Sequence, residues 1–335
     1  MPTLTFWTAC AAALGLTAGT PLKRHHQFKT RHSTGCGMTH NEGFNNGTAN
    51  HSIESGGYTR TYAVNVPDGY NDNTEKMWPL IIDYHGKLPS SCNGGTPYQQ
   101  YDNSQYDKYS AGQEYLVVYP QGYNGSWQGP TYAVKGVDDL QFTTDLLAKM
   151  RTQYCIDDNR VYASGKSNGG GFVDTLACSD NGDEFAAFAM ASAALYTDTS
   201  EDSCTKKRAI LESHGDEDST IPYHPTKDGS GGPLPDIDKW FSWWGHRTCG
   251  SAAIPVNSGD LGGYNTTCYS CDDYSDVISH YQIFELGHCW PSSTSSNWDA
   301  SDHYNQTTRK CLDKALDYTP VVLDFFGKWN LENAP

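Results

Sequence analysis

The sequence predicts an α/β protein with a mostly parallel sheet that is covered by helices on both faces. Two continuous apolar runs, "WPLIIDYHG" (78–86) and "EYLVVYPQG" (114–122), end in turn residues, which is typical of strands buried on both faces. The segment "VDDLQFTTDLLAKMRTQY" (137–154) then carries apolar residues at helical spacing. Strands that alternate with helices along a chain indicate a parallel sheet.

The other elements continue this alternation. Residues 25–57 are polar and aperiodic and are expected to form an extended arm, after which "TRTYAVNVP" (59–67) alternates as a strand does. Either Asp138 or Asp139 is expected to cap the helix at 137–154. The later segments are expected to be a strand "NRVYASG", a helix "GGGFVDTLACS", strands "FAAFAMAS" and "KRAILESHG" (207–215), a helix at 236–247, a strand at 276–287 and a helix at 319–330.

The start of the chain has the character of a leader. Residues 1–19 are apolar and carry no charged side chain, and the pair Lys23-Arg24 is typical of a dibasic processing site. Residues 1–24 are therefore predicted to be a removable signal peptide with a short pro-segment, and the protein is predicted to be secreted and extracellular. Residues 25–335 show no internal repeat or linker, so they are expected to form one catalytic-type α/β domain.

Cysteine usage agrees with secretion. Ten of the eleven cysteines follow residue 24, and an even, scattered set in a secreted chain predicts five disulfides. The alternative is a metal site at "CYSC" (268–271), but no second such pair or histidine pair lies nearby, so no metal is expected. Five N-x-S/T sequons predict a glycosylated surface; their asparagines are Asn46, Asn50, Asn124, Asn265 and Asn305. The formal charge of −16 disfavours nucleic acid and anionic membrane as partners.

The stretch "GKSNG" (165–169) matches the pattern G-x-S-x-G between a predicted strand and a predicted helix. In such a nucleophile elbow the serine occupies a strained turn, and glycines two residues to either side avoid a collision with the helix. Ser167 is thus the candidate nucleophile. The alternative, an ordinary N-cap serine, does not explain both Gly165 and Gly169.

Two further strand ends carry the partners that a serine nucleophile needs. The strand at 207–213 is followed by Asp216 and Asp218, and the strand at 276–286 is followed by His288. The chain order nucleophile, acid, histidine is that of the α/β-hydrolase fold. The histidine would remove the proton of the serine hydroxyl, and the carboxylate would orient the imidazole. Spacing alone leaves both aspartates open.

The chain has other histidines that could act as the base. His280 and His303 are the alternatives to His288, whereas His85 and His214, each in a His-Gly pair at a strand end, are expected to be structural or to belong to the oxyanion loop.

The oxyanion of the reaction needs two backbone N–H donors. The first is expected from Asn168, directly after the serine, and the second from Gly86 or Lys87, after the strand that ends in "DYHG".

The motifs together resemble a family. "TGCG", "YAVNVPDGY", "DYHG", "CIDDNRVYASGKSNGGG", "HGDEDSTIPY" and "GHCWP" are similar to segments of fungal feruloyl esterases of carbohydrate esterase family 1, types C and D, and of the related polyhydroxybutyrate depolymerase-like esterases. The resemblance extends from about Cys36 to the C-terminus. Its pattern H-G-x-x-D-x-x-[IV]-P selects Asp218, which implies the triad Ser167, Asp218 and His288. It further implies a secreted enzyme without cofactor that cleaves ferulate from arabinoxylan or pectin fragments.

An aromatic acyl group requires an apolar slot with aromatic walls. Trp127, Tyr223 and Trp290 each follow a strand end or a motif residue and are expected to line the mouth of the site, unless they are ordinary core or surface aromatics. Cys289, next to His288, implies a disulfide close to the site.

Four other functions remain open from the sequence. Acetylxylan esterases and polyhydroxyalkanoate depolymerases would use the same triad. A copper protein could use "HHQF" after Arg24, and a non-catalytic carbohydrate-binding protein would need no triad at all.

Overall fold

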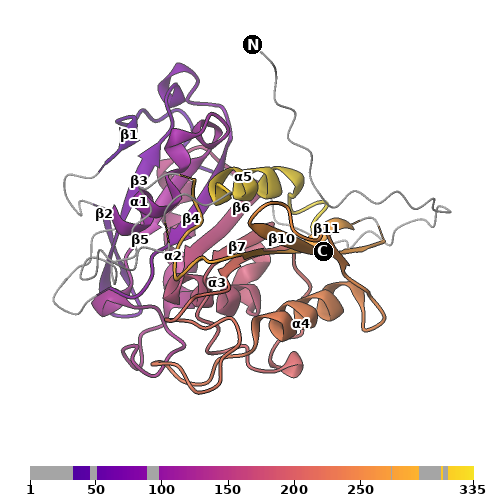
Figure 1. Ribbon diagram of the computed structural model, residues 1–335. Helices are drawn as coiled ribbons and strands as arrows, with labels where there is room; N and C mark the ends of the chain where they lie inside the picture. The colour runs from indigo at the N-terminus through magenta and orange to yellow at the C-terminus, as the bar shows by residue number, and fades with distance from the viewer. Residues whose placement is uncertain (1–32, 46–50, 89–97, 273, 294–310, 312–315) are drawn as a thin grey trace, which may run out of the picture.

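The structure is a computed structural model, and it describes residues 33–45, 51–88, 98–272, 274–293, 311 and 316–335. An eleven-stranded sheet forms its centre, with strands in the order β1-β3-β5-β4-β6-β7-β8-β11-β10-β9 and with β2 paired to β3 (Figure 1). The expected signal and pro-segment (1–24) and the "HHQF" segment lie outside the described residues.

The middle of the sheet is parallel, as the apolar runs predicted. Its strands pair in parallel in the order β5 (Leu116–Pro120), β4 (Trp78–Tyr84), β6 (Ile156–Lys166), β7 (Ala187–Ala191), β8 (Ile210–Gly215) and β11 (Tyr274–Ile283). Every residue of β4, β5, β7 and β8 is buried. Burial of all residues requires cover on both faces, which is why these segments show no polar alternation.

Antiparallel strands complete both edges of the sheet. They are β1 (Gly43–Phe44), β2 (His51–Ser55), β3 (Tyr58–Val66), β9 (Val256–Asn257) and β10 (Tyr264–Cys271). The sequence predicted β3 but treated residues 25–57 as an arm without strands, which is wrong for β1 and β2. These strands are polar because an edge strand needs only one covered face and a neighbour to pair with.

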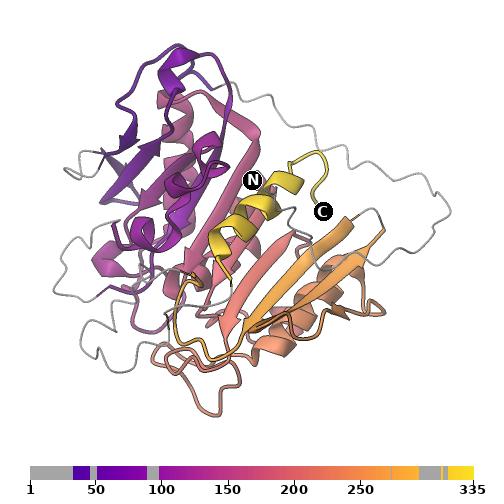
Figure 2. The same ribbon diagram turned by 45° about the horizontal axis from the view of Figure 1, so that its top comes forward.

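Helices cover the sheet on both faces, which confirms the predicted α/β class. They are α1 (Tyr98–Ser104), α2 (Asp139–Gln153), α3 (Asn168–Ala177), α4 (Ile237–Cys249) and α5 (Tyr318–Lys328). Figures 1 and 2 show α5 on one face of the central strands and α3 and α4 on the opposite face. None of the helices in the described part of the chain has the length and apolar character that a bilayer crossing requires.

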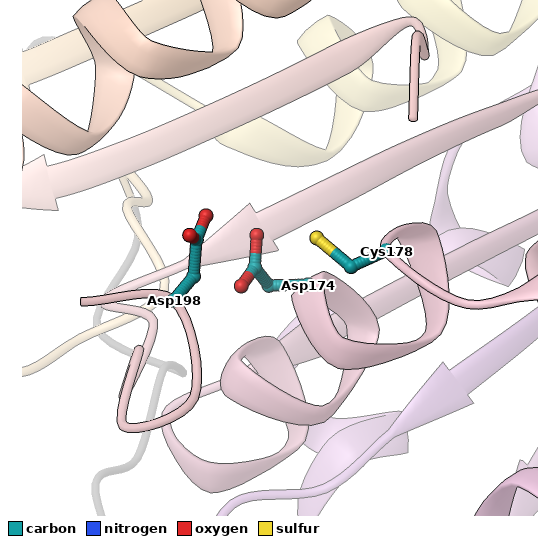
Figure 3. A group of neighbouring side chains, drawn as sticks. All are labelled: Asp174, Cys178 and Asp198. Carbon is teal, nitrogen blue, oxygen red and sulfur yellow. The ribbon is translucent and has the colours of Figure 1, made fainter. Parts of the chain in front are cut away.

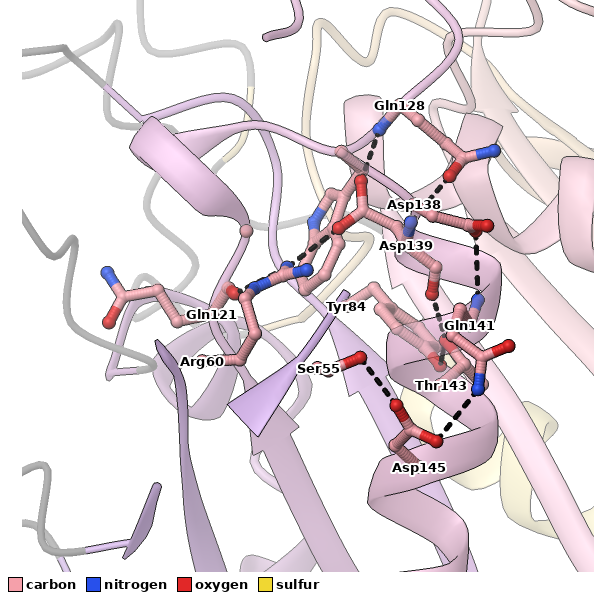
Figure 4. Close-up of polar contacts among 12 residues, drawn as sticks. Ser55, Arg60, Tyr84, Gln121, Gln128, Asp138, Asp139, Gln141, Thr143 and Asp145 are labelled. Carbon is pink, nitrogen blue, oxygen red and sulfur yellow. Dashed lines mark hydrogen bonds and ion pairs between the residues drawn. The ribbon is translucent and has the colours of Figure 1, made fainter. Parts of the chain in front are cut away.

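The start of α2 resolves the choice between two capping aspartates. Asp138 is the cap, since its side chain accepts a hydrogen bond from the backbone N–H of Gln141 at 2.9 Å. Asp139 instead forms an ion pair with Arg60 of β3 at 2.7 Å, and both side chains are buried (Figure 4). Asp138 therefore caps the N-terminus of the helix, whereas Asp139 joins the helix to the sheet.

Four disulfides join described cysteines: Cys36–Cys155, Cys178–Cys204, Cys249–Cys271 and Cys289–Cys311. We call Cys289–Cys311 the site disulfide and Cys249–Cys271 the distal disulfide; each spans 22 residues. A disulfide next to His288, which the position of Cys289 implied, is thus present. The fifth predicted disulfide stays a prediction, because Cys92 lies outside the described residues.

Two of the five sequon asparagines are among the described residues. Asn124 is exposed, and the half-buried Asn265 donates an amide hydrogen bond to Gln282. Asn46, Asn50 and Asn305 lie outside the described residues.

Candidate active site

Ser167 occupies the sharp turn that joins β6 to α3. Its φ of 56° and ψ of −121° are unusual for a residue with a side chain, and such a conformation costs about 1–3 kcal/mol. Hydrogen bonds hold the turn: the N–H of Ser167 donates to the carbonyl of Ala191, and its own carbonyl accepts from Gly171 and Ala194. The strained backbone presents the hydroxyl at the carboxyl end of β6, as an elbow requires.

The glycines around the serine are explained by close backbone approach. A Cβ built on Gly165 would lie 2.7 Å from the carbonyl carbon of Gly169, and one on Gly169 would lie 2.1 Å from the carbonyl oxygen of Tyr84. Gly171 is equally constrained, since its Cβ would lie 2.0 Å from the carbonyl oxygen of Ala194. The run "GKSNGGG" therefore packs the first turn of α3 against β4 and against the segment after β7.

Three side chains form a hydrogen-bonded series at the strand ends. His288 Nε2 lies 2.8 Å from Ser167 Oγ, and His288 Nδ1 lies 2.7 Å from Asp218 Oδ2. The ionised carboxylate of Asp218 can only accept, so Nδ1 carries the proton. Nε2 then accepts from the serine hydroxyl. All three residues were predicted, and the structure brings their side chains together.

Asp218 is held as a carboxylate by its surroundings. Its Oδ1 accepts hydrogen bonds from the backbone N–H groups of Thr220 and Ile221, both at 2.8 Å. Burial alone raises the pKa of Asp218, but the facing imidazoles of His288 and His214 bring this pKa well below its ordinary value. The carboxylate therefore stays ionised, which is the state that orients an imidazole.

The alternative residues lie elsewhere or do other work. Asp216 Oδ1 accepts from the backbone N–H of Glu285 and so joins the turn after β8 to the end of β11. His280 is buried and hydrogen-bonded to Tyr223, while His303 lies outside the described residues. The position of Asp218 agrees with the H-G-x-x-D-x-x-[IV]-P pattern.

The expected oxyanion donors flank the serine. Asn168 is the first residue of α3, where backbone N–H groups have no partner within the helix. A Cβ built on Gly86 would lie 3.2 Å from Ser167 Cβ and 3.7 Å from its Oγ, so this backbone runs directly beside the serine. Lys87 follows with an exposed side chain, and its Nζ lies 3.9 Å from the centre of the Tyr132 ring.

His85 is structural, as the sequence analysis expected. Its Nδ1 lies 2.5 Å from the carbonyl oxygen of Gly86, and its Nε2 accepts from the N–H of Gly122 at 2.9 Å. These two bonds require the neutral imidazole with its proton on Nδ1. Burial favours the same neutral state, because it lowers the pKa of His85 to about 4. The residue fixes the loop that carries Gly86 and Lys87.

The three aromatic side chains expected at the mouth of the site are core residues. Trp127, Tyr223 and Trp290 are 0%, 3% and 1% exposed. Trp127 stacks on Phe142 and Phe172, Trp290 packs against Tyr318, and the hydroxyl of Tyr223 donates to Asp238. The expectation that they line an open slot is therefore wrong: each loop turns inward after its strand and buries the ring.

The sequence reasoning missed one structural role in this loop. The side chain of Asn168 accepts from the backbone N–H of Trp127 at 2.8 Å and donates to its carbonyl. A residue proposed for its backbone thus also fixes the neighbouring loop through its side chain. Nothing in the one-dimensional pattern marks this contact.

A group of metal-ligating side chains is formed by the last turns of α3 and the loop after β7, and its donors are already engaged. Figure 3 shows Asp174, Cys178 and Asp198 close together. The sulfur of Cys178 is bonded to Cys204, and Asp198 is bridged by both terminal nitrogens of Arg247. Asp174 Oδ1 accepts from two indole N–H groups, those of Trp240 and Trp244. This donor set does not fit a metal ion.

The chain is similar in sequence to known esterases. No family model matches the chain. The chain is 27% identical over 252 residues to a probable feruloyl esterase C of Aspergillus niger. This match covers 74% of this chain and 82% of that protein. It is 30% identical over 145 residues to the bifunctional acetylxylan esterase/xylanase XynS20E of Neocallimastix patriciarum, which covers 43% of this chain but only 20% of that longer protein. The predicted resemblance to fungal feruloyl esterases is confirmed.

A solved structure supports the fold. An acetyl xylan esterase from Aspergillus awamori superimposes with a TM-score of 0.50 over 80% of this chain and 94% of that one, at 15% sequence identity. The chain therefore has the α/β-hydrolase fold, as predicted.

Proposed function

We propose that this relative of the fungal feruloyl and acetylxylan esterases is a serine esterase that hydrolyses feruloyl and related hydroxycinnamoyl esters of plant cell-wall polysaccharides. The observation that carries the esterase part is the unbroken hydrogen-bonded series from Ser167 through His288 to Asp218. The similarity to feruloyl esterases carries the choice of acyl group.

The reaction follows from the direction of the hydrogen bonds. As Ser167 Oγ attacks the ester carbonyl, its proton passes to His288 Nε2, and Asp218 stabilises the imidazolium that forms. The N–H of Asn168 and one from Gly86 or Lys87 donate to the oxyanion. His288 then gives the proton to the departing sugar oxygen, which leaves a feruloyl ester on the serine. A water molecule, deprotonated by the same imidazole, releases ferulate.

The proposal includes the setting in which the enzyme works. The disulfides fit an oxidising compartment, so we retain secretion, with residues 1–24 as signal and pro-segment and residues 25–335 as one esterase domain. The substrates would be feruloylated arabinoxylan or pectin fragments rather than nucleic acid or membrane.

A second candidate is deacetylation of xylan by the same triad. It is favoured by the similarity to acetylxylan esterases and by the burial of the three aromatic residues that were expected to bind a cinnamoyl ring. A small acyl group needs no aromatic slot.

The test compares ester substrates and one variant. Release of ferulate from destarched bran and from methyl ferulate is measured beside release of acetate from acetylated xylan and hydrolysis of a polyester film. Ser167→Ala is expected to lower kcat by roughly 10⁴-fold or more while the melting temperature stays near that of the wild type. Hydrolysis by Ser167→Ala at the wild-type rate would overturn the proposal and favour a non-catalytic carbohydrate-binding protein. Activity on acetylated xylan alone would decide for the second candidate.

A further inference from the structure

A second histidine lies against the carboxylate of Asp218. His214 Nε2 is 3.4 Å from Asp218 Oδ2, the same oxygen that His288 contacts. His214 Nδ1 is 2.9 Å from Glu212 Oε1, and its Nε2 is 2.8 Å from the carbonyl oxygen of Ile221. The side chains of Glu212, His214 and Asp218 are all 0% exposed.

The partners of His214 determine its charge. A carbonyl oxygen can only accept, so Nε2 must carry a proton to bond to Ile221. Nδ1 faces a carboxylate, which also accepts when it is ionised. Both ring nitrogens then donate, and the ring is an imidazolium.

Electrostatics agrees with this assignment. Burial lowers the pKa of His214, but the charges of Glu212 and Asp218 and their hydrogen bonds outweigh it and raise this pKa to about 10. Burial raises the pKa of Glu212, yet the two neighbouring imidazoles lower it to about 2. A cation thus lies between two buried carboxylates.

We infer that His214, clamped by Glu212, is a positioning residue that orients Asp218 toward His288 and balances its charge. The inference rests on the proposed esterase function and deepens it. Asp218 Oδ2 lies between two imidazoles, so its position is fixed from both sides. A positive charge behind the carboxylate also opposes the gain of a further proton by the Asp218–His288 pair, so hydrolysis persists to lower pH.

Other titratable groups join this network from β11, from α4 and from the loop after β8. From β11, His280 Nδ1 lies 2.8 Å from Glu212 Oε2. His280 Nε2 contacts the hydroxyl of Tyr223, whose ring edge meets His214 and which donates in turn to Asp238 of α4. The network thus extends from the serine to α4, and His214 is the member that touches the triad.

The experiment measures kcat and KM for p-nitrophenyl acetate between pH 4 and 9, in wild type and in His214→Gln. The amide retains a donor for the Ile221 carbonyl but carries no charge. We expect kcat to fall at least about ten-fold with KM changed less than about three-fold, because the substrate does not touch His214. The acidic limb of kcat/KM is expected to move up by roughly one pH unit. An unchanged kcat and an unchanged limb would overturn the inference.

A double variant separates positioning from stability. His214→Gln leaves the buried Glu212 with only His280 as a neighbouring imidazole, which lowers stability by itself. Glu212→Gln/His214→Gln removes that carboxylate as well, so the melting temperature is expected to recover in large part. The kcat and the acidic limb are expected to remain altered, because Asp218 still lacks the cation. If the melting temperature, kcat and the acidic limb of kcat/KM all recovered, the loss of activity in His214→Gln would come only from lower stability, and the inference would be rejected.

A measurement on the wild type keeps the test independent of folding in the variants. Nitrogen-15 NMR of the histidine rings at pH 8 is expected to show both nitrogens of His214 protonated, with the ring assigned through its contacts to Ile221. A neutral ring at pH 8 would overturn the inference. Ser167→Ala, assayed in parallel, tests the esterase function separately. If this variant still hydrolyses the ester, the proposed function is refuted, whereas the charge of His214 is measured independently by NMR.

Discussion

The buried ion pair between Arg60 and Asp139 gives the sharpest test of how the sheet is joined to α2. The two side chains are 2% and 1% exposed, and Arg60 Nη2 lies 2.7 Å from Asp139 Oδ1. At an effective dielectric constant of about 20, unit charges at this distance attract by about 6 kcal/mol. In the wild type the guanidinium of Arg60 lies 3.8 Å from the centre of the Phe142 ring. Arg60→Met keeps an apolar side chain over this ring but removes the cation.

The variant leaves a buried carboxylate without a counter-ion. Among the contacts in Figure 4, the carboxylate of Asp139 then keeps only one hydrogen bond. Its Oδ2 accepts this bond from the backbone N–H of Gln128 at 2.7 Å. Removing one partner of a buried pair costs about 3–5 kcal/mol, so the free energy of unfolding at pH 7.5 is expected to fall by that amount. The assay is urea denaturation followed by tryptophan fluorescence, with the disulfides intact.

The pH dependence has a definite sign. Burial raises the pKa of Asp139 even though Arg60 lowers it, and loss of Arg60 raises this pKa further. A carboxyl whose folded-state pKa exceeds its unfolded value binds a proton more tightly when folded, so lowering the pH favours the folded state. The loss in free energy of unfolding caused by Arg60→Met is therefore expected to be smaller at pH 5 than at pH 7.5.

A control variant removes both charges. In Arg60→Met/Asp139→Asn the amide oxygen still accepts from Gln128, so stability is expected within about 1 kcal/mol of the wild type and with no added pH dependence. If Arg60→Met loses less than about 1 kcal/mol, or loses as much at pH 5 as at pH 7.5, then the pair does not act as an isolated buried charge pair.

Three further predictions address the elbow, the disulfides and a buried acid. Gly169→Ala places a Cβ 2.1 Å from a backbone oxygen and is expected to lower the melting temperature and activity, whereas Gly327→Ala, with nothing within 4 Å, stabilises by up to about 1 kcal/mol. Serine replacement of either the site or the distal disulfide is expected to cost about 3 kcal/mol, since both span 22 residues, but only loss of the site disulfide should lower kcat. Burial raises the pKa of Asp83 to about 7, so wild-type stability should fall as pH rises from about 4 to about 7. A melting series on Asp83→Asn should lack this slope.

The parts of the fold that the sequence predicts are those in which burial decides the residue type. The central strands were predicted within a few residues, because both faces of β4 and β5 are covered and every position must be apolar. Helices α2, α3, α4 and α5 were also predicted, whereas α1, between β4 and β5, was missed. β2 and β10 were missed. Their polar sequences, "HSIES" and "YNTTCYSC", take their register from β3 and β11 rather than from an apolar pattern of their own.

The same distinction applies to the site. The side chains of Ser167, Asp218 and His288 meet because β6, β8 and β11 are parallel strands whose carboxyl ends lie at one edge. The direction of an aromatic side chain in a loop depends on how that loop folds back. Trp127 turns inward because its indole N–H bonds to the carbonyl of His85, a contact between residues 42 positions apart that leaves no local sequence signal.

The two motifs that did predict the site owe their specificity to steric exclusion as much as to chemistry. In the pattern G-x-S-x-G the first glycine, Gly165, lies against the backbone of α3, and the second, Gly169, lies against the end of β4. In H-G-x-x-D-x-x-[IV]-P the glycine, Gly215, has the same function: a Cβ there would lie 2.1 Å from the carbonyl oxygen of Leu286, in the segment that leads to His288. The turn that carries the acid can approach the turn that carries the base only if this residue has no side chain. Acid and base are thus brought within 2.7 Å by a backbone contact that any side chain would block, which explains why a glycine rather than a reactive group identifies the site in the sequence.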